Sequence, residues 1–237
     1  MRKVIERVLA EVPWRANPYF MGLREQRFRK ADFIETQVQF YFAVIFFARP
    51  MAALAAKIPT AELRVEVLRN VWEEHGQGEL KLTHGSTFRE LLKRLGGLEE
   101  EDINERALWP EVRVFNTALA GCCVLDDHLI SCGAMGIIER MFSEISAWIG
   151  KGIVDNGWLT ADQMVHYDIH EKLDVKHSDD FFKVLEASWN SGGVEERYYI
   201  EQGLRMGAVL FDGLYEGLWR SRQRRLSCEV PERRTRA

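Results

Sequence analysis

The sequence has 237 residues, of which 46% are hydrophobic and 29% are charged, and its formal net charge is −4. A chain of this length and composition can bury a substantial core, and its lack of a basic excess argues against nucleic-acid binding. Four cysteines without C-x-x-C spacing exclude a disulfide scaffold and favour a reducing, cytoplasmic location. The apolar stretch at residues 40–47 is too short to span a membrane, and the amphipathic N-terminus does not resemble a signal peptide.

Helical periodicity runs through the whole chain, and strand-like alternation is hard to find. Breaks carry proline or glycine: Pro18 and Pro50 interrupt the first segments, and glycine pairs end two later ones. Thr160 and Gln163 resemble a capped helix start. Helices are predicted over residues 2–11, 31–57, 60–75, 79–95, 101–128, 130–154, 160–172, 178–190 and 194–224.

No Ser/Gly/Pro-rich linker and no internal repeat divides these segments. We therefore predict an all-α bundle of about seven to nine helices, formed by a single domain over residues 1–225. A basic tail follows over residues 226–237, and the arginines at 220–225 are interpreted as a solvated helix end.

Near the C-terminal third, His170, Asp174 and His177 are spaced for one face of a helix, because each residue turns the helix by about 100°. Two imidazoles and a carboxylate on one face could form half of a metal site. The alternative is a polar face in contact with water, since the surrounding segment is charged.

A second signal is the run from Trp72 to Glu79, with the sequence WEEHGQGE, which is followed by His84. Two glycines inside an apolar helical pattern cost roughly 1 kcal/mol each relative to alanine, which predicts a break in the helix there. A glutamate and His84 could then face one cavity from either side of the break. The alternative is a loop with surface glutamates.

The third signal is Glu139, which lies inside the apolar run GIIERMF. A buried acid needs a partner, which could be a metal ion or a cation such as Arg140. Glu144, one turn further on, is a competing candidate for the same role.

Together these segments supply three carboxylates and three imidazoles, a donor set that suits iron or manganese. Six protein ligands are enough for two ions with open positions for dioxygen. Clustered carboxylates would repel one another in an apolar core unless a metal compensated their charge. The candidate metal ligands are Glu74, His84, Glu139, His170, Asp174 and His177.

These motifs resemble the heme-oxygenase-like diiron oxidases and oxygenases, which share their fold with thiaminase-like and PQQ-synthase-like proteins. The matching patterns are an acidic pair before x-Gly-x-Gly with His84 ten residues after the second acid, Glu139 in Gly-x-x-Glu, and a closing His-x-x-x-Asp-x-x-His. The opening residues 17–20 and the helix at 36–50 are also similar. The resemblance spans residues from about 15 to 215.

Two assignments depend on this resemblance. An unbroken helix would align Glu73 with His84, whereas the family pattern, with its break, assigns Glu74. Glu35 is a candidate for an additional carboxylate ligand, as found on the first long helix of some relatives. The remaining histidines, at positions 75, 128 and 166, fall outside the pattern.

The resemblance implies a non-heme diiron enzyme with two Fe(II) ions per chain and O2 as co-substrate. It would oxidise a small, amino-acid-derived metabolite by N-hydroxylation, desaturation or C–C cleavage in a biosynthetic pathway. Further expected partners are an external electron donor and a second copy of the chain in a homodimer, with no membrane partner. Candidate substrate anchors are Arg49, Arg197, Arg205, Tyr41 and Tyr198.

Three alternatives remain open at this stage. The chain could be a metal-free, heterocycle-binding enzyme of the thiaminase-like or PQQ-synthase-like type, although such proteins need not keep all six candidate ligands. It could be a helical interaction protein with a vestigial site. It could also consume its own Tyr19 as substrate.

Overall fold

A computed structural model describes residues 1–227, apart from the side chains of residues 168–173. This part of the chain forms ten α-helices, of which α6 has five residues, and its one β-bridge pairs Arg106 with Ser227. The all-α prediction is therefore confirmed. The helices are α1 (Arg2–Glu11), α2 (Pro18–Arg24), α3 (Lys30–Lys57), α4 (Ala61–Glu74), α5 (His84–Gly96), α6 (Glu100–Asn104), α7 (Pro110–Leu125), α8 (His128–Asp155), α9 (Tyr167–Ser191) and α10 (Val194–Ser221).

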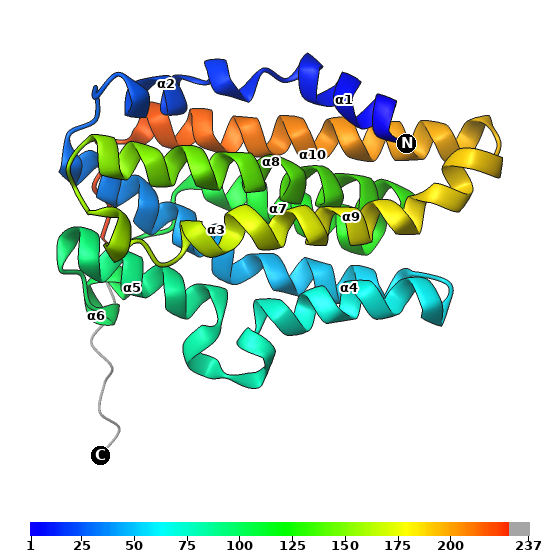
Figure 1. The fold of residues 1–237 in the computed structure, drawn as a ribbon, viewed down its shortest axis with the longest axis horizontal. Coiled ribbons are helices and arrows are strands. Elements are labelled where there is room, and N and C mark those ends of the chain that lie inside the picture. The colour runs from blue at the N-terminus through cyan, green and yellow to red at the C-terminus, as the bar shows by residue number, and fades with distance from the viewer. Residues whose placement is uncertain (228–237) are drawn as a thin grey trace.

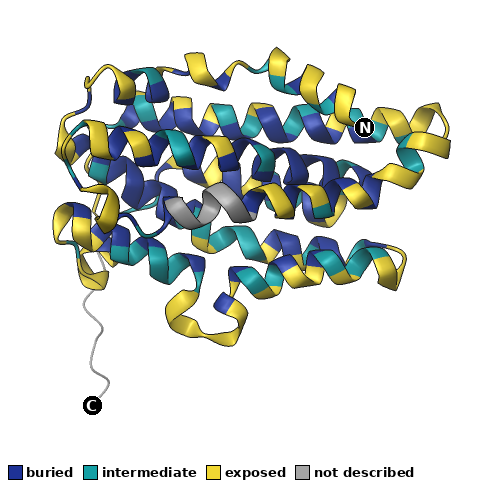
Figure 2. Cartoon of the chain, in the orientation of Figure 1, coloured by how far each residue is buried: buried dark blue, intermediate teal, exposed yellow. Residues whose placement is uncertain are grey.

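The helices form a bundle in which α8, α9 and α10 run lengthwise, with α1 and α2 along one edge and α4 and α5 along the other (Figure 1). Helix α8 packs against α9 and α10, and α3 packs against α4, α5 and α7. Buried residues cover the inward faces of these helices, and exposed residues gather on the outer helices and connecting turns (Figure 2). The core therefore lies between α3, α7, α8, α9 and α10.

Small residues allow α10 to approach α8 closely. A Cβ added at Gly203 would meet the carbonyl oxygen of Ile130, and one added at Gly207 would meet that of Ala134. Both glycines are buried, so nothing larger fits without moving the helix backbones apart. This contact fixes α8, the helix that carries Glu139, in the centre of the bundle.

Several predicted boundaries change in the folded chain. The helix predicted over 101–128 is divided into α6 and α7, because Pro110 occupies the first turn of a new helix. The helices predicted over 160–172 and 178–190 are joined in α9, and the predicted cap formed by Thr160 and Gln163 closes only a 3-10 turn. Pro50 lies inside α3 without ending it.

Helix α3 is long and apolar enough, by length and composition, to cross a membrane. Half of its most apolar window is buried inside the bundle, and the helix packs against α4, α5 and α7. A core helix of a globular protein has these same properties, so they are weak evidence for a membrane span.

The sequence suggested that the basic residues at the end of the last helix are solvated, but those that follow α10 have acidic partners. Arg224 Nη1 lies 2.7 Å from Glu111 Oε2, and Arg225 Nη2 lies 2.7 Å from Asp32 Oδ1. The backbone beyond them stays attached, because Ala107 N–H donates to the carbonyl of Leu226 over 2.9 Å. These arginines therefore pair with acids on other helices, the buried Asp32 of α3 and the partly buried Glu111 of α7, which lie far away along the sequence. Residues 228–237, most of the predicted tail, lie outside the described residues.

Candidate metal centre

The break between α4 and α5 is the first element of the site. Gly76, Gln77 and Gly78 have φ angles of 65°, 55° and 92°, a left-handed backbone that two glycines make accessible. A Cβ at Gly76 would lie 2.6 Å from the carbonyl carbon of Leu82, so the loop is also tightly folded. The predicted helix break is confirmed. It separates Glu74, the last residue of α4, from His84, the first residue of α5.

Across this break the two side chains meet in the bundle interior. Glu74 Oε2 lies 2.8 Å from His84 Nδ1, and both side chains are buried. Burial alone lowers the pKa of His84, but the negative charges of Glu74, Asp174 and Glu73 outweigh it and raise that pKa overall. The acids around His84 therefore favour a positive charge at this part of the site.

Glu139 approaches from α8, on which nearly every neighbour is apolar. Its side chain is buried, and Oε1 has no hydrogen-bond partner among the described residues. Burial, followed by the negative charges of Asp174 and Glu74, raises the pKa of Glu139 well above its ordinary value. The ionised form of an acid in this position is costly for the protein unless a cation binds beside it.

Helix α9 contributes Asp174 and His177, which a spacing of three residues puts on one helix face. Both side chains are fully buried, and His177 Nδ1 lies 4.0 Å from Asp174 Oδ1. Burial is the main reason that the pKa of Asp174 is raised well above its ordinary value. The side chain of His170 lies outside the described residues, so its role stays a prediction.

Glu74, Glu139 and His177 bring one potential ligand atom each within 4.8 Å of one another, and we call these three the ligand group. Asp174 and His84 contact its members, so five of the six predicted ligands gather at one place. The donors are carboxylate oxygens and imidazole nitrogens, and one buried oxygen of Glu139 lacks a described partner. Such a set fits a cation such as iron. Their role as metal ligands stays a prediction.

Glu73 points to a different side of α4 from Glu74. Its Oε2 lies 2.7 Å from His177 Nε2, and both of its oxygens lie 3.2 Å from Lys176 Nζ. Partial burial raises the pKa of Glu73, but the hydrogen bonds from His177 and Lys176 outweigh that effect and lower it overall. From the sequence alone, Glu73 is only a rival to Glu74 as a ligand, and its contact with His177 is not predicted. Helix geometry indicates that the two adjacent acids point about 100° apart, but it does not identify His177 as the partner of Glu73.

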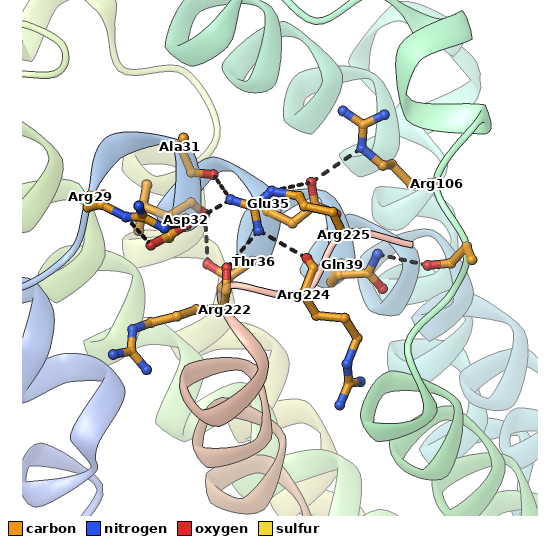
Figure 3. Close-up of polar contacts among 12 residues, drawn as sticks. Arg29, Ala31, Asp32, Glu35, Thr36, Gln39, Arg106, Arg222, Arg224 and Arg225 are labelled. Carbon is orange, nitrogen blue, oxygen red and sulfur yellow. Dashed lines mark hydrogen bonds and ion pairs between the residues drawn. The ribbon is translucent and has the colours of Figure 1, made fainter. Parts of the chain in front are cut away.

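Glu35 lies in a separate polar cluster on α3 (Figure 3). Its Oε2 lies 3.2 Å from Arg106 Nε and 3.9 Å from Arg225 Nε, and it is not part of the ligand group. The neighbouring acid, Asp32, pairs with Arg29 and Arg225. Glu35 therefore has arginine partners at the position where an additional metal ligand was considered.

The remaining candidates from the sequence lie apart from the ligand group. His166 is buried, and its Nδ1 lies 2.9 Å from Thr87 Oγ1. Tyr19 is fully buried, with its hydroxyl 2.9 Å from Thr36 Oγ1. Arg205 pairs with Glu11 and Glu201 on the outer side of the bundle. The other proposed anchors are also absent from the described walls of the cavity beside the site.

A cavity of about 420 Å³, its mouth included, adjoins the ligand group. Its described walls are apolar apart from Glu74, His84 and Glu139. Val44 and Phe47 on α3 are partly exposed, so the mouth lies beside them, and the other apolar wall residues are buried. The apolar wall residues are Phe40, Ala43, Val44, Phe47, Phe115, Ile138, Phe142 and Phe211.

The comparison with protein families assigns this chain to a class. The profile of a family described as "Iron-containing redox enzyme" matches residues 35–210, a range that includes the whole ligand group. The protein therefore belongs to this family of iron-containing redox enzymes. A search of curated proteins finds no match.

Solved structures confirm the predicted heme-oxygenase-like fold. A domain of unknown function with this fold from Shewanella denitrificans has a TM-score of 0.73 at 16% identity, covering 94% of this chain and 91% of its own. A CADD-like protein of unknown function from Nostoc punctiforme gives 0.74 at 15% identity, covering 93% and 96%. A TenA homolog from Pseudomonas syringae gives 0.71 at 15% identity, covering 90% and 91%. At such low identity these similarities establish the fold alone.

Proposed function

We propose that the protein is a non-heme diiron oxidoreductase that activates dioxygen to oxidise a small molecule. The observation that carries this proposal is the ligand group, in which three buried side chains from three helices converge. Glu139 is its decisive member, because burial and two neighbouring acids hold its carboxyl at a raised pKa and one of its oxygens lacks a described partner. A bound cation would relieve all of these costs.

In this proposal Glu74, His84, Glu139, Asp174 and His177, together with His170, hold two ferrous ions. Bound iron supplies electrons for the reduction of dioxygen. The protein contributes ligands whose positions are set by packed helices, so little reorganisation accompanies binding. Phe40, Phe142 and Phe211 line the adjoining cavity and exclude water from the site.

The cavity indicates which part of a substrate reaches the site. Its described walls offer no charged side chain outside the candidate ligands, whereas Arg197 donates to the carbonyl of Trp189 and Arg205 pairs with acids elsewhere. We therefore propose that the reacting part of the substrate is apolar. An amino-acid-derived metabolite belongs to this class if its charged groups stay at the mouth, near Val44 and Phe47.

The test is anaerobic reconstitution of the full chain with Fe(II), followed by metal analysis and exposure to oxygen. We expect two iron ions per chain, and oxygen consumption by the reduced protein with an added electron donor. Less than about one ion per chain would favour the metal-free, heterocycle-binding alternative. Iron binding without oxygen consumption would favour a vestigial site. A homodimer remains part of the proposal on the basis of the resemblance alone.

A further inference from the structure

Glu73 and His177 make a contact at the edge of the ligand group. Glu73 Oε2 lies 2.7 Å from His177 Nε2, on a histidine that is fully buried. The other ring nitrogen, Nδ1, has no hydrogen-bond partner among the described residues and lies 4.0 Å from Asp174 Oδ1. The two nitrogens of this imidazole therefore have different surroundings, one bonded to a carboxylate and one turned toward the candidate ligands.

We infer that Glu73 is a positioning residue for the metal centre, which holds His177 in the orientation and tautomer that metal binding requires. Its carboxylate accepts a hydrogen bond from Nε2–H, which leaves the lone pair of Nδ1 for the metal. Histidine ligands commonly donate their second N–H to a carboxylate, and this contact raises their basicity and fixes the ring. This inference rests on the proposed function, since it concerns the same site.

Lys176 fixes the carboxylate in turn. Its Nζ lies 3.2 Å from each oxygen of Glu73 and 3.7 Å from Asp180 Oδ2. The amide of Asn70, one turn earlier on α4, reaches the backbone carbonyl of His177 over 3.4 Å. Helix α4 therefore holds this part of α9 at its backbone and at its side chains, so that the imidazole has little freedom to turn.

Helix geometry separates the roles of the two adjacent acids. Glu73 and Glu74 follow one another on α4, so their side chains leave the helix about 100° apart. Glu74 belongs to the ligand group, and Glu73 does not. One acid can therefore bind the metal while its neighbour supports a histidine ligand.

The test measures Co(II) binding to the metal-free full-length protein by visible absorption, which reports both affinity and coordination. We compare the wild type with Glu73→Gln and with Glu73→Asp, which keeps the charge on a shorter side chain. We expect Glu73→Gln to weaken binding by roughly 10- to 100-fold and to shift the absorption bands, with the same number of ions bound at saturation. Glu73→Asp should lie between this variant and the wild type.

Two controls separate positioning from simple loss of a contact between helices. Glu66→Gln removes another α4 acid that pairs with α9, through Lys183 at 3.8 Å, without touching a histidine, and should bind Co(II) like the wild type. Lys176→Gln keeps the contact between Glu73 and His177, and its affinity should fall less than that of Glu73→Gln.

Each remaining outcome overturns the inference. Wild-type affinity and an unchanged spectrum in both Glu73 variants would mean that the contact has no role in metal binding. Loss of one bound ion at saturation in Glu73→Gln would make Glu73 a ligand itself. An equal loss of affinity in Glu66→Gln would mean that Glu73 acts only through the packing of α4 against α9. If the wild type bound neither Co(II) nor Fe(II), the proposed function would fail together with this inference. The other outcomes contradict the inference alone, because in them the wild type still binds metal.

Discussion

Among the residues whose side chains are described, two groups of buried acids differ in how their charges are compensated. On α3, Asp32 and Glu35 contact Arg29, Arg106 and Arg225, and the hydrogen bond from Arg29 is the main cause that lowers the pKa of Asp32 (Figure 3). In the ligand group, burial and neighbouring acids raise the pKa of Glu139.

The contrast separates a structural role from a binding role. The acids of α3 have cations supplied by the chain itself, so their pairing contributes to the fold and ties the end of α10 to α3. Burial and neighbouring acids oppose the ionisation of Glu139, so its carboxylate form is favoured only when an external cation compensates its charge. Buried acids on their own therefore do not identify a metal site. The charge of their neighbours is what separates a candidate metal site from a set of structural ion pairs.

The largest effect is expected when Glu139, the acid of α8, is replaced. Glu139→Gln should weaken Fe(II) binding by more than roughly 100-fold, because it removes a metal ligand. Loss of a residue that only supports a ligand typically lowers metal affinity by roughly 10- to 100-fold. The metal-free variant should melt at a higher temperature than the metal-free wild type, because a neutral amide replaces a buried acid. Metal analysis and thermal unfolding measure both effects.

Its matched control is Glu144→Gln, one turn further along α8. Glu144 is partly exposed and pairs with Arg15, so this variant should bind iron like the wild type. Equal iron contents in both variants would show that Glu139 is not a metal ligand. They would also contradict the distinction between the two groups of acids.

A second prediction concerns the effect of metal on stability. Fe(II) at 100 times its dissociation constant should stabilise the folded protein by about 2.7 kcal/mol for each bound ion, because the unfolded chain lacks the assembled site. Anaerobic urea unfolding with and without iron measures this gain. Asp32→Asn should show the same gain and Glu139→Gln should show almost none, whereas equal gains in all three proteins would place the metal elsewhere.

A third prediction addresses the arginine-paired acids. Asp32→Asn should lower the free energy of unfolding by about 1–3 kcal/mol, because Arg29 and Arg225 lose the negative charge and one of the two oxygens that accept their hydrogen bonds. Its iron content should not change. Glu6→Gln, which disrupts an exposed pair with Arg2, should cost much less and provides the reference. Loss of iron in Asp32→Asn would contradict this prediction, because it would mean that the arginine-paired acids also support metal binding.

The smallest expected effect is a dependence on pH. Since the pKa of Asp32 is lowered in the folded state, its pairing stabilises the protein above the unfolded-state value of about 3.9. That contribution should be lost as the pH falls from there through the folded-state pKa, where the unfolded chain binds more protons. Urea unfolding between pH 5 and pH 3 should show a shallower decline for Asp32→Asn than for the wild type. Parallel curves would contradict the assignment.

Local sequence signals carried much of the fold and of the site. The helix periodicity predicted the all-α class, and the glycines at 76 and 78 predicted the break that lets Glu74 and His84 face each other. The spacing of Asp174 and His177 placed them on one helix face. These predictions succeed because helix periodicity, glycine conformation and residue spacing on a helix are local properties.

Other features depend on contacts between distant segments. Sequence could not show that α9 runs unbroken from Tyr167 to Ser191, because packing against α8 outweighs the weak local helical signal there. It also could not assign Arg225 to Asp32 on α3, or Glu73 to His177 on α9.

The sequence by itself therefore determined the helical class and the break after α4, and it supplied the residues that we propose as metal ligands. Only the tertiary structure decided which buried acids have arginine partners and which face one another across the core. The physical reason is that the energy of a buried charge depends on its neighbours in space, and those neighbours come from helices far apart along the chain.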